Sequence, residues 1–92
     1  MTRIIILELI WDEVNKEHIK KHSVSTEEVE NIGKNFIYHR KTHTCRYMAV
    51  GRSGNRLITI IIRRKAPKKY YPVTARDASK KERKDLYAKE KK

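Results

Sequence analysis

The sequence predicts an α+β fold, with a mostly antiparallel, curved sheet of four to five strands and helices packed on one of its faces. Three observations lead to this prediction. The chain has 92 residues, which suffices for one hydrophobic core and one domain over 1–92. Capping boxes mark two helix starts, and the stretch between them has the apolar pattern and residue types of strands. The expected order is strand, two helices, four strands, helix.

The first strand and the first helix are predicted near the N-terminus. Residues 3–10 have strand length and a high content of Ile and Leu. Asp12 can accept a hydrogen bond from a free backbone amide, which predicts a helix from there to about His22. The helical period places three residues on one expected face: Val14, His18 and Ile19.

The second helix has the clearer start signal. Ser25 and Glu28 form a capping box, in which each side chain accepts from the other residue's amide. Val24 and Val29 flank this box as an apolar staple. A helix over 26–34 is therefore expected.

From Asn35 onward the sequence favours strands. Four segments are expected: 36–40, 44–50, 56–64 and 70–75. Glycine-containing 51–55 predicts a hairpin turn, and 66–69 predicts another turn. Cys45 falls in the second of these strands, where a small core residue is the expectation.

A last helix is predicted after these strands. Ser79 and Glu82 form the second capping box, and the helix should extend to about Lys89. Few of its residues besides Leu86 and Tyr87 are apolar, so it should pack peripherally. Residues 89–92 are expected to fray.

The net charge is +12 and is unevenly distributed. Residues 1–33 carry four basic and seven acidic residues, 34–62 carry six basic residues and no acid, and 63–92 carry thirteen basic and four acidic residues. Because many basic residues fall in predicted strands, they should project from a sheet face. A polyanion or an acidic protein is the expected partner.

Several classes of protein are disfavoured by the sequence. One cysteine excludes an internal disulfide framework, and no apolar run reaches membrane-spanning length. The N-terminus lacks a signal peptide, so a cytoplasmic protein is expected. His18 and His22 lie four apart but have no evident third ligand, so neither a metal nor a cofactor is expected. Gly51–Gly54 is one residue short of a serine nucleophile motif.

Basic residues interleaved with aromatic residues remain as candidates for function. Guanidinium groups bind phosphate in bidentate fashion, and tyrosine stacks on unpaired bases. Metal-free RNA cleavage needs cations at the phosphate and a proton carrier, which His, Tyr or Lys can supply. The alternative is that the tyrosines pack in the core and the arginines cover it. The set comprises Arg40, Arg46, Tyr47, Arg56, Arg63, Lys65, Tyr70, Tyr71 and Arg76.

An ordered series of motifs between about Ile10 and Tyr87 resembles the BrnT family, the toxins of a bacterial type II toxin–antitoxin system. The resemblance implies a RelE-like fold, ribonuclease activity that inhibits translation, and neutralisation by a BrnA-like antitoxin. Two departures are Ser23, where the family commonly has Gly, and the basic segment 38–43, which is often acidic in relatives. The motifs are Trp11-Asp12, His18, Lys21-His22, Val24, Glu27-Glu28, Arg46-Tyr47, Ala49, Gly51-Arg52-Ser53, Arg56-Leu57-Ile58, Thr74-Ala75-Arg76, Ala78, Glu82-Arg83 and Tyr87.

The leading hypothesis is a metal-independent RNA endonuclease. The resemblance implies that Arg46 and Arg76 meet the RNA phosphate, and it indicates His22 as a proton carrier. His39 and His43 are further acid–base candidates that the residues themselves offer. Glu82 also matches the family, but its capping role is weighted higher. RNA is expected to contact Arg40, Arg56, Lys65, Tyr47 and Tyr71. Two alternatives have the same fold: a non-catalytic nucleic-acid-binding module, and an interaction protein that docks an acidic partner. The expected assembly is either a homo-oligomer or a hetero-oligomer with the antitoxin.

Overall fold

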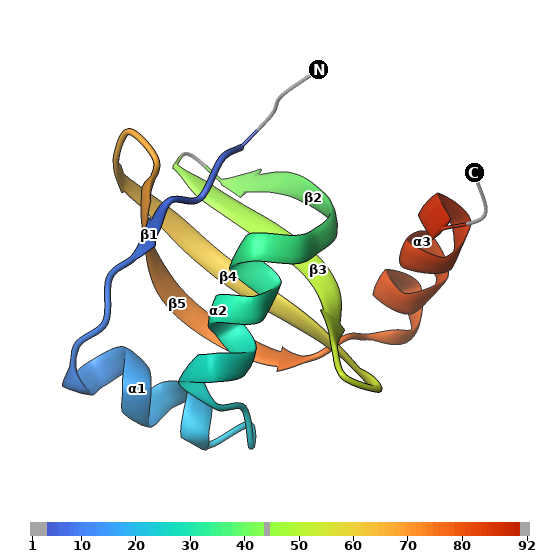
Figure 1. The fold of residues 1–92 in the computed structure, drawn as a ribbon, viewed down its shortest axis with the longest axis horizontal. Coiled ribbons are helices and arrows are strands. Elements are labelled where there is room, and N and C mark those ends of the chain that lie inside the picture. The colour runs from blue at the N-terminus through green and yellow to red at the C-terminus, as the bar shows by residue number, and fades with distance from the viewer. Residues whose placement is uncertain (1–3, 44, 91–92) are drawn as a thin grey trace.

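The computed structural model describes residues 4–43 and 45–90, which fold into a five-stranded sheet with three helices (Figure 1). The predicted order of elements is confirmed. In chain order the elements are β1 (Glu8–Leu9), α1 (Glu13–Lys20), α2 (Thr26–Asn35), β2 (Phe36–His43), β3 (Arg46–Ser53), β4 (Arg56–Ala66), β5 (Lys69–Asp77) and α3 (Lys80–Glu90).

The sheet has the strand order β1-β5-β4-β3-β2. Strands β2 to β5 pair antiparallel with their neighbours, whereas β1 pairs parallel to β5. The sheet is therefore mixed, with one short parallel strand at its edge.

The first strand is much shorter than predicted. Only Glu8 and Leu9 pair with β5. The amides of Leu7 and Glu8 donate to the Lys68 carbonyl, and the amide of Ile10 donates to the Tyr70 carbonyl. Ile5 is 50% exposed and Leu7 is 73% exposed. The apolar run over 3–10 therefore contributes single buried anchors, such as Leu9, rather than a continuous strand; residue 3 lies outside the described residues.

The inner face of α1 also differs from the prediction. Val14 is 73% exposed and His18 is exposed, whereas Asn15 and Ile19 are buried. Asn15 replaces an apolar residue there because its amide completes a capping box with Asp12 and donates to the Ile10 carbonyl at 2.9 Å. Because these hydrogen bonds satisfy its polar atoms, Asn15 can be buried without a large desolvation cost. The helix ends at Lys20, two residues before the predicted end.

Helix α2 begins as predicted. The Ser25 hydroxyl accepts from the Glu28 amide, and the Glu28 carboxylate accepts from the Ser25 amide. Val24 and Val29 are buried beside this cap. The helix continues to Asn35, and Phe36 starts β2 directly, so the helix–strand connection has no intervening loop.

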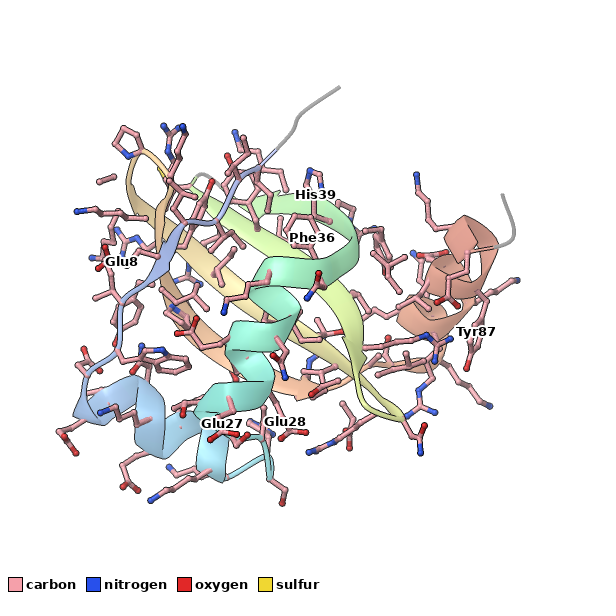
Figure 2. All side chains as sticks on the ribbon, viewed as in Figure 1. Glu8, Glu27, Glu28, Phe36, His39 and Tyr87 are labelled. Atoms are coloured by element: carbon pink, nitrogen blue, oxygen red, sulfur yellow. The ribbon has the colours of Figure 1, made fainter. Side chains whose placement is uncertain are left out.

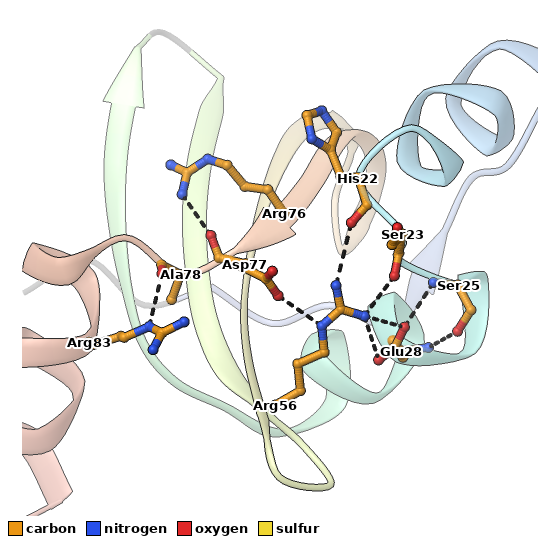
Figure 3. Close-up of polar contacts among 9 residues, drawn as sticks. All are labelled: His22, Ser23, Ser25, Glu28, Arg56, Arg76, Asp77, Ala78 and Arg83. Atoms are coloured by element: carbon orange, nitrogen blue, oxygen red, sulfur yellow. Dashed lines mark hydrogen bonds and ion pairs between the residues drawn. The ribbon is translucent and has the colours of Figure 1, made fainter.

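The sheet separates two hydrophobic cores of different size. Successive residues of a strand point to opposite faces. On β4, Ile58, Ile60 and Ile62 face the large core under α1 and α2, while Leu57 packs in a smaller core with Leu86 of α3. The prediction that all helices cover one face is therefore wrong for α3, which lies across the sheet from the other two (Figure 3).

Three connections between strands depend on a left-handed residue. Gly54 in the β3–β4 turn has φ 63°, Lys68 in the β4–β5 turn has φ 65°, and Cys45 between β2 and β3 has φ 62°. Cys45 is exposed. It was expected in a strand as a core residue, but the chain reverses at this point and turns its side chain away from the core.

Candidate nucleic-acid interface

The face of the sheet that α3 covers also carries four basic side chains, of which Arg40 lies beside α3. Arg46 pairs with Arg63, Arg40 pairs with Met48 of the smaller core, and Lys65 follows Arg63 by two residues. Strand alternation therefore places the four cations on one face. We refer to Arg40, Arg46, Arg63 and Lys65 as the cationic end.

These four cations have no acidic partner within the described part of the chain. None of them takes part in an ion pair or a side-chain hydrogen bond there. The sequence contains no Asp or Glu between Glu30 and Asp77, so β2, β3 and β4 cannot supply one. Arg46 and Arg63 are directly opposed across two strands, a like-charge pair that destabilises a sheet. The arrangement suits an anion supplied from outside.

Tyr71, one of the predicted RNA contacts, borders the cationic end. It pairs with Arg63 in the sheet, and the Lys65 ammonium lies 5.7 Å from the centre of its ring. Its hydroxyl donates to the Asp12 carboxylate at 3.0 Å. Burial and this bond to Asp12 raise the pKa of Tyr71.

Tyr47 lies on the other face. It is 8% exposed and packs edge-to-face on Tyr70, with ring centroids 5.9 Å apart. Its ring is part of the large core and cannot stack on a base without opening that core. The prediction that Tyr47 contacts RNA therefore disagrees with its position.

Arg76 is held by an ion pair beneath α3. Its guanidinium donates to both carboxylate oxygens of Glu82, at 2.7 and 2.9 Å, and the same carboxylate accepts from the Thr59 hydroxyl at 2.7 Å. The Ser79 amide adds a fourth donor. Burial alone would raise the pKa of Glu82, but these hydrogen bonds outweigh it and lower the pKa to about 2. Glu82 is thus both the capping residue that was predicted and the partner of Arg76.

The three residues predicted as catalytic do not come together. Arg46 pairs with Arg63, while Arg76 pairs with Thr59 two strands away and four residues along β4. This offset corresponds to roughly 16 Å between the two Cα atoms, and the Arg76 guanidinium is paired with Glu82. His22 lies in the turn after α1, on the opposite side of the sheet, and its ring is 5.6 Å from that of His18.

Arg56 has internal partners for its guanidinium (Figure 3). It donates to Asp77 at 2.8 Å, to the Glu28 carboxylate at 3.3 Å and to the backbone carbonyls of Ser23 and His22. Hydrogen bonding to Asp77 raises the pKa of Arg56 against a smaller opposing effect of burial. Its predicted role in RNA binding would compete with these contacts, which join β4, β5 and the α1–α2 turn.

The remaining histidines belong to β2. His39 pairs with Ala49 of the large core and packs edge-on against Phe36, with ring centroids 5.5 Å apart (Figure 2). It therefore faces away from the cationic end. The backbone of His43 pairs with Arg46, which makes it the histidine nearest to the cationic end in the sheet register.

Sequence reasoning missed a hollow between β2 and α3. It has a volume of about 350 Å³ and is lined by Tyr38, His39, Arg40, Asp85, Ala88 and Lys89. The hydroxyl of Tyr38 is buried and has no hydrogen-bond partner among the described residues. Burial, and then the nearby Asp85 carboxylate, raise the pKa of this phenol. The hollow forms because α3 packs beside β2. This contact depends on the side of the sheet that α3 occupies, and the local sequence does not encode that side.

Two other features bear on the site. Within residues 4–43 and 45–90, no three His, Cys, Asp or Glu side chains are grouped so as to hold a metal ion. In the same part of the chain, the helices are all too short or too polar to span a bilayer.

Comparison with protein families and with curated proteins finds no match for this sequence. Among solved structures, the ribonuclease toxin BrnT of Brucella abortus is similar, with a TM-score of 0.64 and 24% sequence identity. The match covers 79% of this chain and 97% of the BrnT chain. The chain therefore has a fold similar to that of BrnT.

Proposed function

We propose that this protein is a toxin-like, metal-independent ribonuclease that acts in the cytoplasm and inhibits translation. The observation that carries the proposal is the cationic end: four basic side chains without acidic partners, on a sheet whose fold is shared with a ribonuclease toxin. A cost in sheet stability, as between Arg46 and Arg63, is expected where charge serves binding rather than folding.

In this proposal Arg46 and Arg63 hold the scissile phosphate. Paired guanidinium groups can neutralise the charge that grows on the phosphate oxygens during attack by the 2′-hydroxyl. Lys65 and Arg40 extend the contact along the RNA backbone, and Tyr71 offers an aromatic ring for an unpaired base. Arg76 stays paired with Glu82 and contacts the phosphate next to the scissile one.

A proton carrier is also needed at the 2′-hydroxyl or at the leaving oxygen. We propose His43 for this role, because its backbone pairs with Arg46. The earlier candidate His22 lies across the sheet from the cationic end, and His39 packs against Phe36. The variant His43→Ala should lose cleavage but keep RNA binding.

Two consecutive arginines of β4 provide a matched test. Arg63 belongs to the cationic end, whereas Arg64 is equally exposed and lies on the opposite face beside Tyr70. Arg63→Gln should reduce cleavage of a labelled RNA in excess chelator by 10²-fold or more, while Arg64→Gln should retain it. Equal loss in both variants would place the reaction elsewhere.

The partner is proposed to be an acidic, BrnA-like antitoxin that covers the cationic end. Such a partner would supply the carboxylates that the sheet lacks. Co-expression with the antitoxin should relieve growth inhibition, and the purified antitoxin should displace RNA. Rescue without displacement would mean that it binds another surface.

A second candidate function is nucleic-acid binding without catalysis. It is favoured by one observation, namely that Arg46, Arg76 and His22 do not converge. Tight RNA binding by the wild-type chain, with no cleavage with or without ribosomes, would favour this function over the ribonuclease.

A further inference from the structure

The acidic side chains of α3 all have partners or lie on its inner side. Glu82 is 10% exposed and pairs with Arg76. Glu90 accepts two hydrogen bonds from Arg52, at 2.7 and 2.8 Å, which lower the pKa of Glu90. Asp85 lines the hollow beside β2. None of the three acids therefore remains to neutralise the outer side of the helix.

The outer side of α3 carries a stripe of basic and aromatic residues. Lys80, Arg83, Lys84 and Tyr87 recur with helical spacing, are exposed, and line a shallow groove of about 580 Å³. We call these four residues the outer stripe. The Tyr87 side chain projects away from the sheet (Figure 2), is 46% exposed, and has the Arg52 guanidinium 5.9 Å from the centre of its ring.

The guanidinium of Arg83 is held in place while its outer nitrogens stay available. Its Nε donates to the Ala78 carbonyl at 3.0 Å (Figure 3). Its two terminal nitrogens have no partner among the described residues. A guanidinium fixed at one nitrogen is already oriented when it meets a phosphate, so less conformational freedom is lost on binding.

Helix electrostatics do not account for the lysines of the outer stripe. The N-terminal end of a helix carries partial positive charge, so cations in its first turns are unfavourable. Lys80 and Lys84 are also a like-charged pair four residues apart, which destabilises a helix further. Cations concentrated at this end therefore require another reason.

We propose that the outer stripe is a second RNA-binding surface, which takes a single-stranded stretch flanking the segment bound at the cationic end. Lys80, Arg83 and Lys84 contact consecutive phosphates, and an unpaired base stacks on the free face of Tyr87. A duplex keeps its bases stacked inside, so the tyrosine selects single strands. This inference deepens the ribonuclease proposal by naming where the substrate extends.

The test uses the full chain and a single-stranded RNA of about twenty nucleotides, with binding measured over a range of salt concentrations. The variant K80Q/R83Q/K84Q removes three cations from the outer stripe, and K16Q/K20Q/K34Q removes three exposed cations from the α1–α2 side as a matched control. Each phosphate contact in a single strand contributes about 0.7 to the slope of log K against log salt. The stripe variant should lower this slope by about 2, whereas the control should leave it unchanged. Thermal melts confirm that both variants fold.

A second pair of variants tests the aromatic contact. Tyr87→Ala should weaken single-strand binding about tenfold without changing the salt slope, and Tyr87→Phe should bind like wild type. Equal slopes for stripe variant and control would overturn the inference, as would equal loss of duplex and single-strand binding in Tyr87→Ala. RNA that binds with the predicted slopes but is never cleaved would reject the ribonuclease proposal and retain the outer stripe.

Discussion

Replacing Glu82 with glutamine tests the ion pair that fastens α3 to the sheet. The Glu82 carboxylate accepts hydrogen bonds from Arg76, Thr59 and the Ser79 amide, and its side chain is only 10% exposed. The fall in its pKa from 4.5 to about 2 corresponds to roughly 3 kcal/mol of folding free energy. Glutamine keeps the shape but loses the charge and one acceptor. We therefore expect Glu82→Gln to lower the free energy of unfolding by about 2–3 kcal/mol at pH 7.

The pH dependence gives a sharper test of the same contact. Because the pKa of Glu82 is lower in the folded state, its contribution is complete above the unfolded value of 4.5 and is lost as the pH falls toward 2. The difference in stability between wild type and Glu82→Gln should therefore be largest at neutral pH and shrink below pH 4.5.

Urea unfolding followed by circular dichroism at pH 7, 5 and 3 measures this difference. Asp85→Asn is the matched control, because Asp85 lies in the same helix and has no ion pair among the described residues. A difference between wild type and Glu82→Gln that stays constant from pH 7 to 3 would refute the reasoning. Equal destabilisation by both variants would do the same.

Three further substitutions test other contacts, each by its urea unfolding curve. Tyr38→Phe removes a buried hydroxyl that has no hydrogen-bond partner in the described part of the chain, so it should raise stability by about 1 kcal/mol; a loss would show that the hydroxyl is satisfied. Gly51→Ala should cost about 1–3 kcal/mol, because its methyl group would lie 3.1 Å from the Cα of Phe36, which is backbone and cannot rotate away; a neutral result would mean that β2 shifts freely. Arg56→Met should cost about 1–2 kcal/mol, because its part-exposed guanidinium bridges Glu28 and Asp77; unchanged stability would leave Arg56 available for RNA.

Local signals in the sequence predicted the helix starts, and long-range packing determined what they missed. The capping boxes at Ser25 and Ser79 lie within four residues of chain, so the sequence alone identifies them. The side of the sheet covered by α3 depends on how the chain leaves β5, and no local pattern records that choice. Val14 was expected on the buried face of α1 because apolar residues usually occupy that face. Asn15 takes the buried position instead, because its polar atoms are all hydrogen-bonded there.

The candidate site also combines residues that the sequence indicates with partnerships that only the assembled fold creates. The resemblance indicated Arg46, but its partnership with Arg63 depends on the register of β3 and β4. Arg56 and Arg76 looked equivalent to Arg46 in the sequence. Their acidic partners, Glu28, Asp77 and Glu82, distinguish them, because these contacts form only when the strands and helices are assembled.

The parallel pairing of β1 has a consequence for how the chain folds as it is made. Glu8 pairs with Lys69, 61 positions later in the sequence. The segments of α1 and α2 leave the ribosome early, but β1 cannot pair until β5 has emerged. The edge of the sheet is thus completed late in synthesis, and for most of translation the nascent chain exposes Leu9 and its neighbours. Until β5 has been synthesised, a chaperone or a partner that binds extended apolar segments has its best opportunity to bind the segment around Leu9.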